Sequence, residues 1–420
     1  MRRDLTLYWW GQTTTAFGSV FTAIAVPVVA VVQLGASPGW LGVITAAGIV
    51  PVLLLGLPAG ALADRITRPR RTLVALDVVS AVAVGTVALG LTTDIVTIGW
   101  LVALGVVQGG LSVFTGSLYF VHLTELVGKD GIGRARARLQ AGQYGASLVG
   151  RSLAGPAVAL FGGEAALGVD AVSFALSALA LRAMHSPDHA RRTAGPTPSA
   201  GLPTGVVGGL RFLFAHPYHR ALLAFVLSSA VGLTGMNALT GPFLLLVLGL
   251  PTEAYGLVFA LSGAMGLAGS AVAGRILGPD RDTHRITVIT FAAGMACTLL
   301  LPLATGPLVL AGLCAALGIG LPVLFGAIAN VALSAAVVAD IPEHLLGRAM
   351  AGLQVLMAAA GVAGALAGGA LGDWVGVRPA LWLLALVMLT AMVLAAPLAL
   401  RAALRQATTV AAADETLDPA

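Results

Sequence analysis

The stretch Gly133-Arg-Ala-Arg-Ala-Arg-Leu-Gln140 recurs as Gly347-Arg-Ala-Met-Ala-Gly-Leu-Gln354, at an offset of 214 residues (347 − 133). Self-similarity at a fixed offset is the signature of a duplicated unit. The same shift superposes further pairs without a gap: Gly18 on Gly232, Gly60 on Gly274, Arg71 on Arg285, Gly150 on Gly364, Gly155 on Gly369 and Gly162 on Gly376. The repeat predicts two copies of one unit in the same orientation.

The composition around this repeat is too apolar for a protein surrounded by water. Of 420 residues, 58% are hydrophobic and 10% are charged, and the mean hydropathy is +0.95. About 20 apolar residues suffice to cross a bilayer core. Such spans lie at about 8–33, 40–63, 72–92, 97–121, 139–161, 164–184, 220–247, 254–277, 286–304, 307–334, 348–371 and 376–400. The sequence therefore predicts an all-α integral membrane protein with twelve transmembrane helices in two six-helix bundles, with the lipid bilayer as its partner.

The two bundles are expected at residues 1–184 and 220–402. Between them, residues 185–219 are polar, basic and rich in proline, which is typical of a linker. Residues 206–214 could form a short helix on the membrane surface. Residues 403–420 are small and acidic, and we expect a disordered tail there.

Positive charge gathers on one side of the predicted membrane. With the N-terminus inside, the even-numbered connections, the span ends that adjoin them and both tails hold all of the 23 Lys and Arg residues except Arg151 and Arg378. Because cytoplasmic loops carry an excess of Lys and Arg, both termini are expected in the cytoplasm of a multi-pass protein of the bacterial inner membrane. The net charge of +5 thus reflects topology, and nucleic acid is not expected as a partner.

The segment Gly60-Ala-Leu-Ala-Asp64-Arg65-Ile-Thr-Arg68-Pro-Arg70-Arg71 follows the second span. It resembles the first conserved motif of the major facilitator superfamily. The segments 8–19 (Tyr-Trp-Trp-Gly-Gln-Thr-Thr-Thr-Ala-Phe-Gly-Ser) and 170–179 (Asp-Ala-Val-Ser-Phe-Ala-Leu-Ser-Ala-Leu) resemble, more narrowly, actinobacterial drug, macrolide and siderophore exporters. The resemblance implies a transporter that works by alternating access, and we expect a monomer.

The resemblance also implies roles for the motif residues. Gly60 and Asp64 would belong to a latch that holds the two halves together on the cytoplasmic face in the outward-open state. Arg65 and Arg71 would take part in the same gate, or would only enforce topology. Two features depart from the family: the glycine-rich pattern of the fifth span, with Gly155-Pro156, is off-register for an antiporter, and Gly105 stands where proton-coupled members often have an arginine.

Three charged residues inside the spans are candidates for function. Arg151 is about ten positions from either end of the fifth span, where an unpaired arginine is costly. It could bind an anionic group of the substrate, pair with Asp170 as part of a gate, or form a purely structural ion pair. Asp77 could titrate during proton coupling or pair with the arginines just before it. Tyr119, His122 and Glu125 share one helical face at the inner end of the fourth span. They could form a proton relay, or they could simply be the solvated end of the helix.

Neutral polar residues inside the spans are candidates for the lining of a substrate cavity: Gln108, Gln143, Tyr144, Asn237, Asn330 and Gln354. Each could instead bond a neighbouring helix. Because charges are few at mid-membrane, a hydrophobic or amphiphilic substrate is expected. Cys297 and Cys314 have no histidine nearby, so neither a metal nor another cofactor is expected.

Energy for transport would come from an ion gradient. The chain's one lysine, Lys129, precedes Asp130 and so forms no phosphate-binding Gly-Lys-Ser/Thr loop. Export of a small drug-like, antibiotic or siderophore-like compound by proton antiport is the leading interpretation. Uptake or facilitated diffusion by the same fold, and a sensor or scaffold without transport, are the alternatives. Integral-membrane enzymes usually have Asp, Glu, His or Cys residues clustered near one interface. The sequence shows no cluster of that kind, so an enzyme is not expected.

Overall fold

The computed structural model describes residues 2–185, 217–276, 283–340 and 343–394, together with 211, 214, 215 and 397. Within these residues the chain is helical, without strands. The elements are α1 (Arg2–Val28), η1 (Val29–Gln33), α2 (Pro38–Arg65), α3 (Pro69–Thr92), α4 (Ile98–Arg182), α6 (Pro217–Pro242), η2 (Phe243–Val247), α7 (Thr252–Ile276), α8 (Thr283–Thr298), α9 (Leu300–Leu303), α10 (Leu308–Asp340) and α11 (Glu343–Val375). A last helix covers Val377–Leu394. Most of the predicted linker 185–219 and the whole tail 403–420 lie outside the described residues.

Twelve crossings follow from the helices that are long and apolar enough to span a membrane. The described residues contain 11 such segments, and one of them, Arg138–Arg182, is 45 residues long. This is about twice the length that one crossing needs. Gly162, near its middle, has φ +83°, a left-handed conformation that glycine adopts without steric cost. The chain reverses there, so this segment crosses twice, as the spans 139–161 and 164–184 predicted.

The connection between the fourth and fifth spans differs from the expectation of three separate helices. The structure continues one helix, α4, from Ile98 through residues 122–138. Leu123, Leu126 and Ala135 in this connection are buried in a cluster with Tyr8 and Leu73. The connection is helical because it buries an apolar stripe against α1 and α3. We refer to residues 98–121, 139–161 and 164–182 as the first, second and third limbs of α4.

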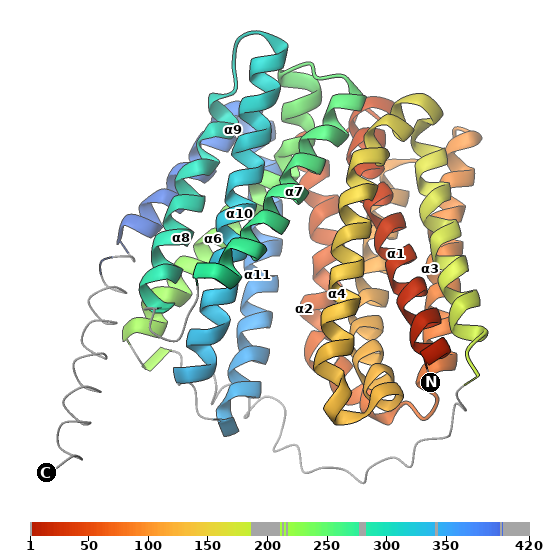
Figure 1. Ribbon diagram of the computed structural model, residues 1–420. Helices are drawn as coiled ribbons and strands as arrows, with labels where there is room; N and C mark the ends of the chain where they lie inside the picture. The colour runs from red at the N-terminus through yellow and green to blue at the C-terminus, as the bar shows by residue number, and fades with distance from the viewer. Residues whose placement is uncertain are drawn as a thin grey trace, which may run out of the picture.

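The predicted duplication is visible in the backbone. The π-helix η1 at Val29–Gln33 has its counterpart in η2 at Phe243–Val247, which again is an offset of 214 (243 − 29). Left-handed glycines recur at the same offset: Gly35 (φ 59°) with Gly249 (65°), and Gly162 (83°) with Gly376 (90°). Two six-helix bundles with the same local irregularities confirm the parallel repeat. Figure 1 shows them side by side, red to yellow and green to blue.

Helix packing repeats as well. A Cβ on Gly18 would overlap Ser173 and Asp170, and a Cβ on Gly232 would overlap Met388. In both halves the first helix therefore lies tightly against the sixth.

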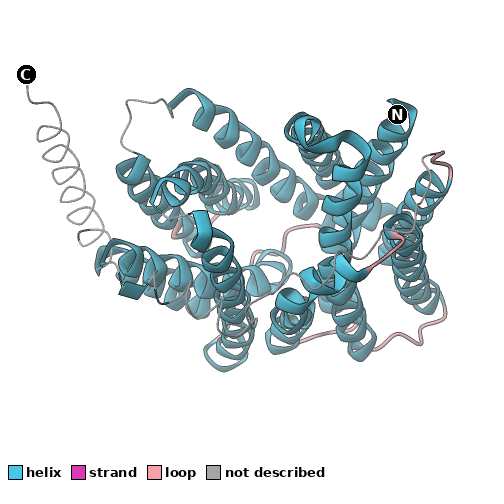
Figure 2. Cartoon of the chain, turned by 90° about the horizontal axis from the view of Figure 1, so that it is seen from below, coloured by secondary structure: helices cyan, strands magenta, loops and turns pink. Residues whose placement is uncertain are grey.

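Seen from below, the helices form two groups (Figure 2). The face that carries the N-terminus and the α2–α3 connection is called the termini face, and the opposite one the far face.

The two halves meet at two glycine crossings near the far face. A Cβ on Gly155, in the second limb of α4, would lie 2.5 Å from the Cα of Gly256 on α7. A Cβ on Gly369 of α11 would lie 3.0 Å from the Cα of Gly42 on α2. The offset of 214 relates Gly42 to Gly256 and Gly155 to Gly369, so the two crossings are pseudo-symmetric copies. Small residues allow such backbone contact between membrane helices.

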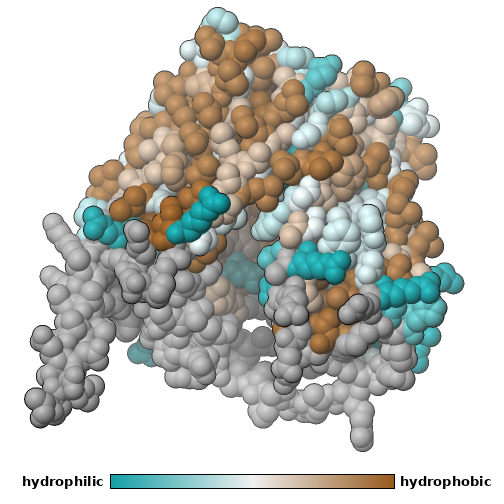
Figure 3. Space-filling model, in the orientation of Figure 1, coloured by the Kyte–Doolittle hydropathy of each residue, from teal (hydrophilic) through white to brown (hydrophobic). Residues whose placement is uncertain are grey.

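Toward the termini face these contacts end. A Cβ on Gly56 of α2 or on Gly145 of α4 would meet nothing within 4 Å, and Tyr144 and Gln354 are exposed. Figure 3 shows the molecule hollowed between the halves at this end, below a broad hydrophobic girdle. The structure is thus closed at the far face and open at the termini face.

A methyl group at the crossing should prevent this closure. We expect Gly155→Ala to lower the population of the closed far face about tenfold, since overpacking costs about 1–3 kcal/mol. Spin labels at exposed positions Phe161 and Val309, in a background without native cysteines, should report a longer distance across the far face. Gly168→Ala, where a Cβ meets nothing within 4 Å, is the control. An unchanged distance distribution in Gly155→Ala would show that the crossing tolerates the methyl group.

Candidate functional site

The far face is also closed by a polar contact between the halves. Asp373, near the end of α11, accepts a hydrogen bond from the backbone N–H of Gly39 at 3.0 Å and one from the Ser37 hydroxyl at 3.1 Å. The carboxylate thereby caps the first turn of α2, where the helix dipole favours negative charge. We call this contact the far-face latch. Asp373 is not among the candidates predicted from the sequence, because the helix that it caps lies more than 300 residues away.

Arg151 lies directly beside the Gly155–Gly256 crossing. A Cβ on Gly263 of α7 would be 3.2 Å from its Cδ and 3.7 Å from its Nε, so the side chain lies against the other half. Its guanidinium forms no hydrogen bond or ion pair with any described residue. Arg378, the other basic exception, donates to the Ala304 carbonyl at 2.9 Å and stacks over Phe243. Arg151 is thus a half-buried cation without a described partner.

Asp170 does not pair with Arg151. Its carboxylate, in the third limb of α4, is buried and accepts hydrogen bonds from the hydroxyls of Thr22, Ser19 and Ser173. Two of these hydroxyls come from α1, so Asp170 ties α1 to the third limb of α4. In this state of the protein the side chains of Arg151 and Asp170 are therefore not paired with each other.

Asp77 does not pair with the arginines before it either. It is buried on α3, and its Oδ2 accepts a long hydrogen bond of 3.4 Å from the Tyr119 hydroxyl. The Tyr8 hydroxyl in turn donates to the Tyr119 carbonyl at 2.8 Å, and the Tyr8 ring lies 5.8 Å from that of His122. The structure therefore brings Asp77, Tyr119 and His122 together with Tyr8, which the sequence analysis had missed.

The motif between α2 and α3 is described in part. Gly60, Asp64 and Arg65 belong to the last turns of α2, and their side-chain surroundings lie outside the described residues. Arg71 is exposed at the start of α3. Arg70 donates to the Met184 carbonyl at 2.7 Å, so one basic residue of the motif caps the third limb of α4 within its own half.

The neutral candidates are spread over both halves. Gln143 donates from Nε2 to Oε1 of Gln12 at 3.1 Å, and Gln108 is half-buried. Tyr144, Asn237 and Gln354 are exposed. Asn330 alone among the six lines a pocket that the structure outlines within its C-terminal half.

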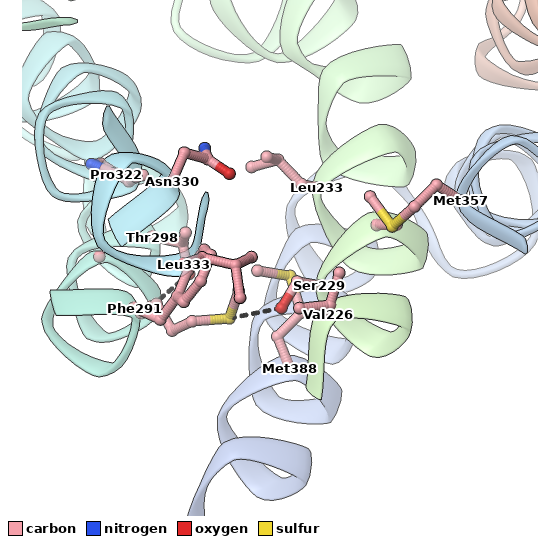
Figure 4. A pocket seen from close by; sticks show the side chains of 14 residues that line it. Val226, Ser229, Leu233, Phe291, Thr298, Pro322, Asn330, Leu333, Met357 and Met388 are labelled. Atoms are coloured by element: carbon pink, nitrogen blue, oxygen red, sulfur yellow. Dashed lines mark hydrogen bonds between the residues drawn. The ribbon is translucent and has the colours of Figure 1, made fainter. Parts of the chain in front are cut away.

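This pocket measures about 200 Å³ and is almost wholly apolar. It lies between α6, α8, α10, α11 and the last helix. Figure 4 shows Asn330 on α10 and Leu233 on α6 pointing toward each other across it. Its lining consists of Val226, Ser229, Ala230, Leu233, Phe291, Gly294, Met295, Thr298, Pro322, Gly326, Asn330, Leu333, Met357 and Met388.

The chemistry of the pocket favours adaptable apolar contact. Met295, Met357 and Met388 come from three different helices, and methionine side chains repack easily around different shapes. Phe291 adds an aromatic surface, and Asn330 supplies a neutral polar group. Among the lining residues only Asn330 is a candidate predicted from the sequence, because polar residues inside spans are the feature that a sequence shows. Methionines in three separate spans would have been the signal for the pocket.

Comparisons with known proteins agree with this architecture. A family model described as Major Facilitator Superfamily matches residues 8–339. The multidrug efflux pump Tap of Mycolicibacterium fortuitum is 30% identical over 404 residues, which cover 92% of this chain and 94% of that protein. The uncharacterized MFS-type transporter YfiS of Bacillus subtilis (strain 168) is 28% identical over 385 residues, 87% of this chain and 86% of the relative.

A solved structure shares the fold. A mutant form of the nucleoside transporter NupG superposes with a TM-score of 0.74 at 13% identity, covering 94% of this chain and 99% of that chain. At this identity the likeness concerns the arrangement of helices, not the substrate.

Loss of the negative charge from the far-face latch should loosen the closed end. A carboxylate at a helix N-terminus contributes about 0.3–1 kcal/mol, so Asp373→Asn should lower the closed population roughly two- to fivefold. The distance between spin labels at Phe161 and Val309 measures this closed population. Asp94→Asn, a change in an exposed loop of the same face, should have no effect. Equal effects of both substitutions would attribute the change to surface charge in general and not to the latch.

Proposed function

The chain belongs to the Major Facilitator Superfamily and is a multi-pass membrane transporter, and from this premise we propose that it exports a small hydrophobic or amphiphilic compound by proton antiport. The observation that carries the proposal is the apolar, methionine-lined pocket within the C-terminal half. Ligand sites are largely apolar concavities with a few placed polar groups, and Asn330 and Ser229 are such groups here.

The relatives support export. The pump Tap of M. fortuitum, named for multidrug efflux, aligns over nearly the whole of both chains at 30% identity. A pocket that repacks around methionines suits a range of apolar compounds better than one polar metabolite. Drug-like, antibiotic or siderophore-like molecules are therefore the proposed substrates, and the drug resistance of an expressing cell is the proposed phenotype.

The charge pattern supports an orientation. Arg68, Arg70 and Arg71 lie at the termini face, and loops rich in Lys and Arg stay in the cytoplasm. We therefore place both termini in the cytoplasm of a bacterial cell and the far face outside. In this orientation the structure is the inward-facing state of a monomer, which receives substrate from the cytoplasm or the inner leaflet.

Arg151 is proposed to select substrates with an anionic group. It is the cation beside the closed crossing that the structure leaves without a described partner, and a charge at this depth favours a counter-charge strongly. An acidic amphiphile carries both an anionic group suited to Arg151 and an apolar part suited to the pocket.

Transport assays in everted vesicles test the coupling. Vesicles that contain the chain should accumulate the neutral dye Nile red when respiration acidifies their interior, and a protonophore should abolish the accumulation. Gly326→Leu should reduce transport at least tenfold, because a Cβ at this pocket position meets nothing within 4 Å and the larger side chain would occupy the pocket. Gly168→Leu is the control. Accumulation that persists with the protonophore would refute proton antiport.

The role of Arg151 is tested with two dyes. We expect Arg151→Ala to raise the KM for the anionic dye 8-anilinonaphthalene-1-sulfonate about tenfold and to leave the KM for neutral Nile red unchanged. Arg151→Lys keeps a positive charge and should retain much of the anion transport. If Arg151→Ala impairs both dyes equally at normal membrane abundance, the residue serves the crossing and not the substrate.

A further inference from the structure

The duplication assigns every pocket residue a counterpart in the N-terminal half. Subtracting 214 from the residue number leads from each lining residue to the equivalent place on the equivalent helix, as the glycine crossings and the π-helices demonstrate. Six pairs show what has changed: Val226 and Gln12, Leu233 and Ser19, Phe291 and Asp77, Pro322 and Gln108, Leu333 and Tyr119, Met357 and Gln143. In all six pairs the residue of the C-terminal half is apolar and its counterpart in the N-terminal half is polar.

Four of the six polar counterparts form two hydrogen-bonded pairs. Gln143 donates to Gln12 at 3.1 Å, and the Tyr119 hydroxyl donates to Asp77 at 3.4 Å. These contacts join α1 to the second limb of α4 and α3 to the first limb. The positions that line an apolar pocket in the C-terminal half therefore hold two hydrogen-bonded polar pairs in the N-terminal half. We call these two pairs the Asp77 cluster.

Asp77 has weaker support for a negative charge than the other buried carboxylate of this half. Asp170 accepts from the hydroxyls of Thr22, Ser19 and Ser173. Asp77 accepts the long bond from Tyr119, and no Arg, Lys or His among the described residues forms an ion pair with it. A carboxylate that gives up water without gaining a cation or several donors is costly as an anion. Binding a proton removes this cost.

We infer that the duplicated pocket has diverged into two sites with separate tasks, a substrate pocket in the C-terminal half and a proton site at Asp77 in the N-terminal half. This inference rests on the proposed proton antiport. The substrate part that enters the pocket is uncharged, because the pocket offers methionine, phenylalanine and one amide. Proton and substrate then need not compete for one side chain. The alternate opening and closing of the two faces couples proton movement to substrate movement.

Several other titratable groups face the Asp77 cluster and must be separated from it. Tyr119 and His122 come from α4 and Tyr8 from α1. On α3 itself, Arg70 is bonded to the Met184 carbonyl and Arg71 is exposed. His122 is buried and is the group whose titration could most easily be mistaken for that of Asp77, so His122→Gln belongs in the experiment.

Reconstituted full-length protein tests the division of tasks, with Nile red as the probe. Asp77→Asn should reduce accumulation driven by a pH gradient at least tenfold, while exchange of internal for external dye without a gradient stays within about twofold of the wild type. Asp170→Asn and His122→Gln should keep both activities. Gly326→Leu should lose both, because it occupies the pocket.

The outcomes separate this inference from the proposed function. Wild-type protein that does not move Nile red, or moves it independently of the gradient, would refute the proposed function. Coupled wild-type transport together with full gradient-driven accumulation by Asp77→Asn would refute the proton site alone. Loss of exchange in Asp77→Asn would likewise overturn the division, since it would place substrate at Asp77.

A second measurement covers a variant that fails to fold. Tyr119→Phe keeps the carboxyl group of Asp77 and removes the Tyr119 hydroxyl that donates to it. Proton release on addition of Nile red, followed with a pH indicator in detergent, should occur at a different pH than in the wild type. An unchanged pH dependence in this variant would show that the released proton does not come from Asp77.

Discussion

The structure depends on how closely two membrane helices can approach when no water drives them together. In lipid, association relies on van der Waals contact and interhelical hydrogen bonds, and the far face closes where backbone meets backbone at Gly155 and Gly256 and again at Gly42 and Gly369. Side chains at these points would hold the halves apart. The far-face latch of Asp373 adds a polar contact to one of the two crossings. The hollow at the termini face exists because the helices diverge from these contacts.

Duplication explains both the symmetry of this closure and the asymmetry of the interior. Glycines at the crossings are kept in both copies, since each crossing needs them for the same steric reason. Interior positions carry no such shared demand. Phe291 and Asp77, which the repeat places at equivalent points, have opposite polarity. One fold can thus hold an apolar pocket in one half and hydrogen-bonded polar side chains at the equivalent positions of the other.

The membrane environment also separates the two arginines outside the basic loops. Arg378 donates from Nη2 to the Ala304 carbonyl and lies over the Phe243 ring, so contacts within its own half hold this cation. Arg151 lies against Gly263 across the boundary between the halves, without a described polar partner. The position of Arg151 within a span marks it as unusual from the sequence, since a charge at that depth is costly wherever it points. The sequence could not select among the three partners considered for Arg151, because the choice depends on contacts between remote helices.

The sequence by itself determined the twelve crossings, the duplication and the superfamily, because the transfer of a span into lipid is a sum over neighbouring residues and a repeat is visible without coordinates. The helical course of residues 122–138, the hydroxyl partners of Asp170, the contact of Asp77 with Tyr119 and the methionine pocket were decided only by the tertiary structure. Each of them joins segments tens to hundreds of residues apart. Which side chains meet there follows from the packing of whole helices, which no local pattern contains.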